Sequence, residues 1–446
     1  MGPALLLALA ALALPRASAV GGIRGWNSYD DADGATNLTA TLAAAQYMHD
    51  VLLPFGYDLV TLDGGWSDRL DGFGRQLPSA KLSADGSLSA LAAQVRALGL
   101  RLGLWTIRGI PKAAVQQRLP IWNSSFTADQ AARSDQNCSW DADNMGVQDN
   151  EAGRAYYASV AALYSGWGVQ LVKVDCMVEN GAGLLVPDFT AFAEAMRAAG
   201  VLVSISPGHA QNPANASYVA ERALAAHYRI SDDLWDIWDD GCGGNCYPSG
   251  VKGKFARMAA YAPLIGQNSA FADLDMLPFG DVYHMDAGGS AIYGPPSPTH
   301  LTRDEQGTLM TLALITRAPL IFGGRLPLAP GDAWTLGLLT NAEALAAHGL
   351  SGLNRPIPCS GGAEPHAWAA APEALPQPSA YVALFNAGDA AAAVSAQARD
   401  AGLPAGGQYC ARDLWAQRDV GRVGQGGLLT ATLPAHGAGL FLLTAC

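Results

Sequence analysis

The sequence predicts an α/β protein: a (β/α)8 barrel of the TIM type, followed by a C-terminal antiparallel domain resembling a β-sandwich. Short apolar runs alternate with Ala-rich helical stretches about eight times in the first 350 or so residues. The runs are continuously apolar, which is typical of parallel strands buried on both faces. Eight such units favour closure into a barrel over an open sheet. Beyond about Leu350, Gly, Pro and Ala turns separate short strands, which is typical of an antiparallel domain.

Each barrel strand is expected where an apolar run precedes a helical stretch. The clearest runs are Tyr57–Asp63, Leu100–Thr106, Val169–Asp175, Val201–Pro207 and Pro319–Gly324, with weaker ones at Gly22–Trp26, His227–Ser231 and Phe271–Asp275. Helices are expected at Leu88–Leu98, Ala152–Gly166, Phe189–Ala199 and Asp304–Thr316. Later strands are expected at Ala380–Asn386, Leu428–Leu433 and Gly439–Thr444. We therefore place the barrel at residues 20–350 and the β-domain at residues 351–446.

Residues 1–19 are expected to be a signal peptide. An apolar run at Ala4–Leu14 precedes Ala17, Ser18 and Ala19, a small-residue pattern typical of cleavage sites. The run is too short to span a bilayer, so a removed signal peptide is favoured over a membrane anchor. Sequons for N-glycosylation occur at Asn37, Asn123, Asn137 and Asn215. We expect secretion, and the final compartment (cell exterior, cell wall or vacuole) and the oligomeric state stay open.

The charge pattern excludes two classes of partner. The formal net charge is −12, and no basic run compensates it. Nucleic acids and anionic membranes bind clustered Lys and Arg, so neither is expected as a partner. The sequence also lacks the Gly-rich fingerprints of dinucleotide and nucleoside-triphosphate sites, and no cofactor is expected.

The seven cysteines favour disulfides over metal ligation, because no C-x-x-C or His–Cys cluster with zinc spacing occurs. Cys242 and Cys246 are expected to close a small loop disulfide. Cys359 and Cys410 are candidates for a bond within the C-terminal domain, which would leave Cys446 unpaired. Spacing alone does not decide this last pairing.

Candidate functional residues are those that end the predicted strands, because active sites of such barrels lie at the carboxyl ends of the strands. Polar or aromatic residues stand there in six of the runs: Asp63, Trp105 with Arg108, Lys173 with Asp175, Ser206, Arg229 with Asp232 and Asp233, and Asp273 with Asp275. Paired carboxylates facing a neutral substrate are typical of acid/base or nucleophilic glycoside chemistry.

Asp175 stands out among these residues. A single Asp after a barrel strand is often only a helix cap. Lys173, however, lies two residues earlier and so on the same face of the strand. A cation beside a carboxylate keeps it ionised, as a nucleophile requires.

The chain resembles glycoside hydrolase family 27, the α-galactosidase and melibiase family. The resemblance rests on eight motifs in order, GWNSY (25–29), GYDLVTLDGGW (56–66), LVKVDC (171–176), RISDDLWDIW (229–238), ADLDMLPFG (272–280), APLIFGG (318–324), YVALFNAGD (381–389) and RDLWA (412–416). They cover essentially the whole chain after the predicted signal peptide, and the ordered set is highly specific even though each motif alone is weak.

The resemblance implies a retaining glycosidase with Asp175 as nucleophile and Asp233 as general acid/base. It implies that Lys173 and Arg229 bind the sugar and that the ring of Tyr29 stacks near it. It also implies a disulfide between the cysteine after the nucleophile and the preceding loop, Cys138–Cys176.

Two departures from the family pattern concern specificity. The usual second aspartate after Asp63, which together with it holds the 4- and 6-hydroxyls of galactose, is Gly64 here, and Ser206 replaces a Glu near the 2-hydroxyl. WTIRGI (105–110) and SISPG (204–208) are similar to a divergent branch that includes β-L-arabinopyranosidases. Trp105 and Arg108 are candidate bulky neighbours that would exclude the larger sugar.

We expect an exo-acting α-galactosidase first. Alternatives are a β-L-arabinopyranosidase or an α-N-acetylgalactosaminidase on the same scaffold, and a catalytically silent sugar-binding relative. The remaining polar and aromatic candidates receive structural interpretations: Trp235 and Trp238 as core or cleft wall, Asp273 and Asp275 as organisers of the loop after the seventh strand, and His209 and His227 as incidental.

Overall fold

The computed structural model describes residues 22–446 except 33, 180–182, 207–211, 245, 286–290 and 424. The predicted signal peptide, Pro207 and His209 therefore lie outside the described residues. Within the described part of the chain, no helix is long and apolar enough to cross a membrane.

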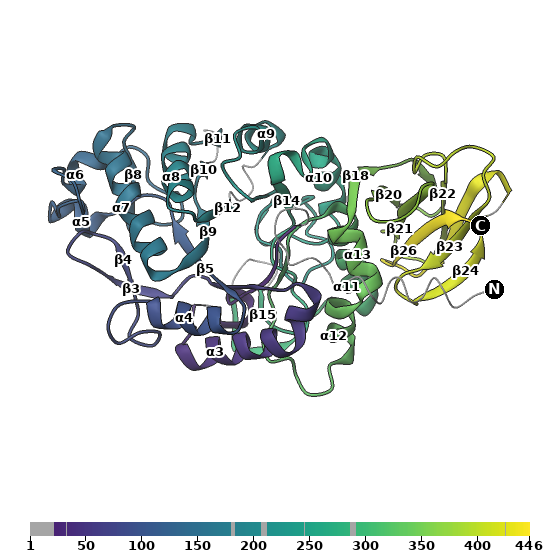
Figure 1. The fold of residues 1–446 in the computed structure, drawn as a ribbon, viewed down its shortest axis with the longest axis horizontal. Helices are drawn as coiled ribbons and strands as arrows, with labels where there is room; N and C mark the ends of the chain where they lie inside the picture. Colours follow the sequence, from purple (N-terminus) through teal and green to yellow (C-terminus); the bar gives the residue numbers. More distant parts are fainter. Residues whose placement is uncertain are drawn as a thin grey trace.

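Eight parallel strands form one curled sheet, which confirms the predicted barrel (Figure 1). Their order around the sheet is β14-β13-β12-β9-β5-β2-β1-β17. Just beyond β14, Leu277 forms a parallel bridge with Phe322 of β17, which brings the two edges of the sheet together. The strands are β1 (Arg24–Asn27), β2 (Leu59–Leu62), β5 (Arg101–Ile107), β9 (Val169–Asp175), β12 (Leu202–Ser206), β13 (His227–Arg229), β14 (Phe271–Asp273) and β17 (Leu320–Phe322).

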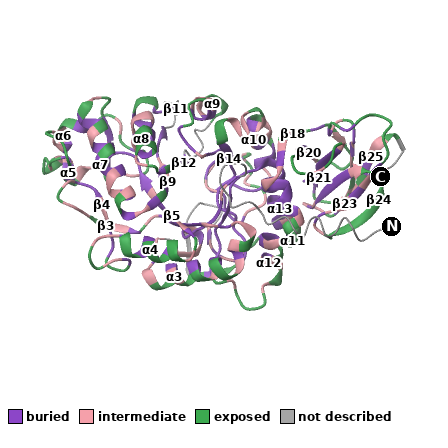
Figure 2. Cartoon of the chain, in the orientation of Figure 1, coloured by how far each residue is buried: buried purple, intermediate pink, exposed green. Residues whose placement is uncertain are grey.

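Helices surround this sheet, and Figure 2 shows buried strands at the centre with the exposed residues on the outer faces of the helices. The longer helices are α3 (Leu38–Tyr47), α4 (Ser89–Ala97), α7 (Glu151–Trp167), α8 (Val186–Ala198), α9 (Pro213–Glu221), α10 (Lys254–Tyr261), α11 (Arg303–Thr316), α12 (Ala333–Thr340) and α13 (Ala342–Gly349). Short insertions that the sequence did not predict include β3 (Ser67–Leu70), β4 (Gln76–Pro78), β6 (Ile110–Pro111), β7 (Ala132–Arg133), β8 (Asn144–Val147), β15 (Asp281–Met285) and β16 (Ala291–Pro298).

Local sequence fixes where the central strand β9 begins. Helix α7 starts after Asn150, whose side chain accepts a hydrogen bond from the backbone of Gly153 (2.8 Å). It ends at Gly168, whose φ of 90° lies in the left-handed region that glycine adopts without strain. The chain therefore reverses and enters β9 at Val169, which places Asp175 at the carboxyl end of the strand.

The C-terminal domain consists of two antiparallel sheets, as predicted. One contains β18 (Ser351–Pro356), β20 (Pro365–Pro372), β21 (Ser379–Asn386), β26 (Ala438–Ala445), β23 (Tyr409–Asp413) and β24 (Arg418–Arg422), and the other contains β19 (Cys359–Ser360), β22 (Ala392–Gln397) and β25 (Leu428–Leu433). Trp415 donates a hydrogen bond to Thr311 of α11 (2.8 Å), and His436 stacks on Trp238 (4.1 Å between ring centres). The domain thus packs on α11 and on the loop after β13.

The structure corrects one cysteine pairing. Cys410 is bonded to Cys446 rather than to Cys359, which has a free thiol. The reason is the sheet arrangement: Cys410 on β23 pairs with Thr444 of β26, which brings Cys446 next to it. Cys359 lies on β19 in the other sheet.

Candidate active site

The pairing register of three neighbouring strands brings the predicted residues to one face. Trp105 of β5 pairs with Lys173 of β9, and Ser206 of β12 pairs with Asp175. Side chains of paired residues in parallel strands point the same way, and residues two apart share a face. These four side chains therefore share the inner face at the carboxyl end of the sheet. The pocket beneath is lined by Asn27, Leu59, Thr61, Leu171, Lys173, Ser204, Ser206, His227, Arg229, Asp273, Asp275, Met276 and Ile321.

The two oxygens of Asp175 have different surroundings. Oδ2 accepts a hydrogen bond from the indole Nε1 of Trp105 (2.7 Å). Oδ1 is buried. Burial raises the pKa of Asp175, whereas Lys173 and Arg229 lower it. Trp105 therefore fixes Oδ2, and Ser206 also lowers the pKa of Asp175 through a side-chain hydrogen bond.

Lys173 joins β9 to the end of β2. Its Nζ lies 2.9 Å from Asp63 Oδ2, and the same oxygen accepts a hydrogen bond from the side-chain amide of Asn27 (2.6 Å). Burial alone would lower the pKa of Lys173, but Asp63, Asp175 and Asp275 together raise it. The lysine therefore stays charged, and it interacts electrostatically with all three carboxylates.

A second cation holds the opposite side of the mouth. Arg229 Nη2 lies 2.7 Å from Asp233 Oδ1, and Nη1 lies 3.4 Å from Asp275 Oδ2. Asp275 Oδ2 also accepts from the backbone N–H of Leu234 (2.9 Å) and so fixes the backbone beside Asp233. The Asp233 side chain keeps 34% of its surface exposed, whereas that of Asp275 is buried. Asp233 thus faces solvent, and Asp275 organises the loop after the sixth strand, β13, whereas the sequence assigned it to the loop after the seventh.

Ser206 completes the ring next to Asp175. Its hydroxyl is buried, and Ser206 pairs with Asp175 across the two strands. A side-chain hydrogen bond from Ser206 lowers the pKa of Asp175. Ser206 therefore supports the ionised form of Asp175 from the adjacent strand.

Asp30 is a buried carboxyl group near the mouth that the sequence did not identify. Both of its oxygens lack a hydrogen-bond partner among the described residues. Burial raises its pKa well above the ordinary value, and Asp275 raises it further. A Cβ at position 323 would overlap Asp30 Oδ2, so only glycine fits there. Asp30 directly follows the GWNSY motif, and this adjacency was the one available signal.

The first motif also supplies an aromatic wall. The ring of Tyr29 meets that of Trp235 edge to face, with ring centres 6.2 Å apart. A Cβ built on Gly64 would have Tyr29 Cε2 at 3.9 Å as its only neighbour within 4 Å. The first atom of a side chain at position 64 would therefore meet open space.

Arg108 is the one predicted substrate-binding residue that the structure does not bring to the mouth. It follows Ile107, which pairs with Asp175, so its side chain points to the other face of β5. There its guanidinium donates to the carbonyl of Cys176 (2.7 Å) and lies 3.3 Å from Asp188. Arg108 therefore supports the loop after β9 from behind.

His227 also differs from the expectation. It was interpreted as incidental, yet its Nδ1 lies 3.1 Å from Asp273 Oδ2. Burial raises the pKa of Asp273, but the hydrogen bond and charge of His227, the backbone N–H of Asp275 and the charge of Arg229 together lower it, and the net shift is downward. The partner comes from the adjacent strand β14, which sequence spacing does not reveal.

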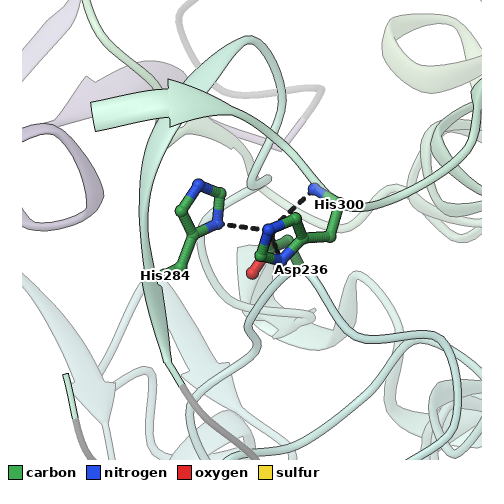
Figure 3. Close-up of side chains that lie close together, drawn as sticks. All are labelled: Asp236, His284 and His300. Carbon is green, nitrogen blue, oxygen red and sulfur yellow. Dashed lines mark hydrogen bonds and ion pairs between the residues drawn. The ribbon is translucent and has the colours of Figure 1, made fainter. Parts of the chain in front are cut away.

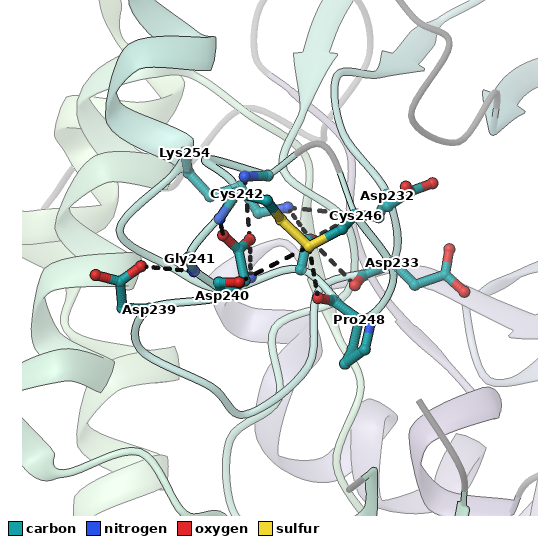
Figure 4. Close-up of a disulfide and its surroundings, with 12 residues drawn as sticks. Asp232, Asp233, Asp239, Asp240, Gly241, Cys242, Cys246, Pro248 and Lys254 are labelled. Atoms are coloured by element: carbon teal, nitrogen blue, oxygen red, sulfur yellow. Dashed lines mark hydrogen bonds between the residues drawn. A yellow bond between two sulfur atoms is a disulfide. The ribbon is translucent and has the colours of Figure 1, made fainter. Parts of the chain in front are cut away.

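The two disulfides expected near the mouth are present. Cys138–Cys176 ties the loop before β8 to the end of β9, beside Trp105. Cys242–Cys246 closes a small loop behind Asp232 and Asp233 (Figure 4).

A clamp of two histidines and a carboxylate holds the β15–β16 hairpin beside the loop that carries Asp233 (Figure 3). Asp236 Oδ2 lies 2.7 Å from Nδ1 of His284 and 3.2 Å from Nδ1 of His300, and it accepts the backbone N–H of His300 at 2.8 Å. These are metal-ligand types, but the two imidazoles stack with ring centres 4.0 Å apart and planes at 20°. Both Nδ1 atoms face the same carboxylate oxygen of Asp236, so we describe this cluster as a hydrogen-bonded clamp.

Comparisons with known proteins agree with this architecture. Residues 364–443 match the family model for the alpha galactosidase C-terminal beta sandwich domain. Over 429 residues (94% of this chain and 85% of the relative), the sequence is 23% identical to an α-galactosidase of Cyamopsis tetragonoloba.

Solved structures give stronger similarity. A GH27 β-L-arabinopyranosidase of Geobacillus stearothermophilus, described in complex with arabinose, is 30% identical with a TM-score of 0.86, and the alignment covers 96% of this chain and 98% of that one. A putative α-N-acetylgalactosaminidase of Bacillus halodurans C-125 is 27% identical with a TM-score of 0.81, covering 96% and 100%.

The barrel, the carboxylates at its mouth and these similarities define a glycoside hydrolase. The chain belongs to glycoside hydrolase family 27.

Proposed function

We propose that the chain is a retaining exo-glycosidase that releases terminal β-L-arabinopyranosyl residues. The sequence alone placed α-galactosidase first. The chain is 30% identical to a β-L-arabinopyranosidase over nearly its whole length and 23% identical to the α-galactosidase. This difference favours β-L-arabinopyranosidase, which the sequence alone gave as an alternative. The observation that carries the proposal is the open space at Gly64.

The chemistry of the two sugars explains why Gly64 matters. β-L-Arabinopyranose is α-D-galactose without its C6 hydroxymethyl group. A site that hydrogen-bonds a hydroxyl gains transition-state binding from it, and a site without the partner does not. Asp63 remains, held by Lys173 and Asn27, and no second carboxylate follows it. Galactose therefore has to bring its extra hydroxyl group out of water without a carboxylate partner, which costs transition-state binding that arabinopyranose does not lose.

In the proposed mechanism, Asp175 Oδ1 attacks the anomeric carbon while the glycosidic bond breaks. Asp233 gives its proton to the departing oxygen, and an ester between the sugar and Asp175 results. Water then attacks the same carbon, Asp233 takes a proton from it, and the bond to Asp175 breaks. Lys173 and Arg229 stabilise the negative charge of the carboxylates in both steps. Trp105 orients Asp175 through its hydrogen bond.

The test compares kcat/KM for the nitrophenyl β-L-arabinopyranoside and α-D-galactoside. We expect the arabinopyranoside to be preferred by at least about tenfold, or about 1.4 kcal/mol. Gly64→Asp restores the missing carboxylate in open space and should raise relative activity on the galactoside. Equal activity on both sugars, or a preference for galactoside, would reject this specificity. The α-N-acetylgalactosaminide belongs in the same panel because the small Ser206 leaves room near the 2-position.

We also propose that the protein follows a secretory route. Its disulfides suit an oxidising compartment. Of the four sequons, Asn123 and Asn137 are exposed, whereas the side-chain nitrogen of Asn215 is buried. Glycopeptide mapping of protein from a eukaryotic secretory host should find glycans at Asn123 and Asn137. Retention of the protein inside that host would count against the route.

A further inference from the structure

Lys254, the first residue of α10, is a buried lysine that the proposed reaction does not use. Its side chain is fully buried, with 0% of its surface exposed. Its Nζ donates to Ser231 Oγ, to Ser249 Oγ (2.8 Å) and to the carbonyl oxygen of Asp232 (3.4 Å). All three N–H groups of an ammonium therefore have acceptors, and none of these acceptors is a carboxylate.

Both serines also form hydrogen bonds to the loop that carries Asp233, so they connect Lys254 to that loop. The single hydroxyl hydrogen of Ser249 is shared between the carbonyl oxygens of Asp232 (2.8 Å from Oγ) and Asp233 (3.0 Å), and the backbone N–H of Ser249 donates to Asp233 O (2.8 Å). Ser231 Oγ donates to Asp232 O (3.0 Å). In Figure 4 the carboxylate of Asp233 points away from Lys254, so the lysine lies behind the loop.

This arrangement is costly for stability, which argues that the amine has a use. A buried cation without a paired carboxylate pays a large desolvation penalty. Burial lowers the pKa of Lys254 to about 7, with Asp275 and Asp240 raising it and Arg229 and Arg257 lowering it. An apolar side chain of the same length would avoid this cost but would supply no donors to the serines.

We propose that Lys254 is a positioning residue for Asp233: through Ser249 and Ser231 it fixes the backbone of the acid/base loop, and so the direction in which Asp233 delivers its proton. This inference rests on the proposed acid/base role of Asp233. Small misplacements of a reacting group are known to cost up to about a hundredfold in rate. The loss should appear only where the leaving group needs a proton.

The experiment measures kcat/KM of Lys254→Met on two glycosides of the preferred sugar. The alkyl glycoside has a leaving group that needs protonation, and the dinitrophenyl glycoside has one that departs without it. We expect a loss of about tenfold or more with the alkyl glycoside and of less than about threefold with the dinitrophenyl glycoside. Lys252→Met is the control, because Lys252 is a partly exposed neighbour paired with Asp239 and Glu364.

Ser249→Ala provides a second route that keeps the backbone hydrogen bond to Asp233 O. It should show the same dependence on the leaving group. The double variant Lys254→Met/Ser249→Ala should lose less than the product of the two single losses, because both act in one chain of contacts. If Lys254→Met does not fold, the leaving-group dependence of Ser249→Ala decides.

Equal losses on both glycosides, wild-type behaviour of Lys254→Met, or fully multiplicative losses in the double variant would overturn the positioning role. A wild-type protein inactive on every glycoside in the panel would instead reject the proposed function. The two failures are therefore distinguishable.

Discussion

The two proposed catalytic carboxylates are held by different kinds of structure. Asp175 ends β9, a central strand bonded on both sides to β5 and β12, and it is half-buried beside Trp105, which donates a hydrogen bond to it. Asp233 lies in a loop, with a third of its side chain exposed. Ser249 holds its backbone carbonyl, Lys254 holds Ser249, and the disulfide loop contacts the neighbouring Asp232 through Gly244. The sheet thus orients one carboxylate, whereas a polar network orients the other.

Replacing Asp175 should have the largest effect. Asp175→Asn removes the nucleophile, and we expect kcat to fall by more than about a thousandfold on every substrate, whatever its leaving group. Steady-state rates on alkyl and dinitrophenyl glycosides measure this, with circular dichroism as the control for folding. Near-normal turnover would remove Asp175 from the mechanism.

Asp233→Asn should have a smaller and selective effect. General acid catalysis contributes about 10²–10⁴-fold, and only substrates whose leaving group needs a proton benefit from it in the first step. We expect the alkyl glycoside to lose most of its rate while the dinitrophenyl glycoside keeps more of it. An equal loss of rate with both leaving groups would contradict the general acid role of Asp233, because Asp233→Asn would then behave like Asp175→Asn.

The pH dependence of kcat/KM tests the ionisation of Asp175, the carboxylate held by the sheet. Its pKa is raised by burial, so the ionised form that attacks is lost as the pH falls through a value above that of an ordinary aspartate. The acid limb of kcat/KM should therefore lie above the ordinary aspartate range. Removing a cation that lowers this pKa, as in Lys173→Met, should move the limb to still higher pH. If the acid limb of kcat/KM stays at the same pH in Lys173→Met, Lys173 does not influence the ionisation of Asp175.

Much of the site followed from sequence because strand period and strand ends are local properties. Lys173 and Asp175 share a face two residues apart, and the structure places them there. The same period would have turned Arg108 outward, since it follows Ile107 on the opposite face. Lys254 was not predicted, because its partners depend on how the loop after β13 folds back on α10.

The outward position of Arg108 leads to the prediction with the smallest effect on catalysis. Arg108→Met leaves Asp188 buried without its cation, and breaking such a pair costs about 3–5 kcal/mol of unfolding free energy. The KM of the remaining folded enzyme should stay close to wild type. Denaturant unfolding measures the loss of stability, and steady-state kinetics measure KM. A raised KM with unchanged stability would show that Arg108 binds the substrate after all.

The central claim is that Asp175 forms a covalent bond to the sugar. The most direct test incubates the enzyme with an activated 2-deoxy-2,2-difluoro glycoside of the preferred sugar, followed by proteolysis and mass spectrometry. We predict one added glycosyl group per chain, located on Asp175, and a product of retained configuration from the natural substrate. A label on another residue, or an initial product of inverted configuration by NMR, would contradict the account.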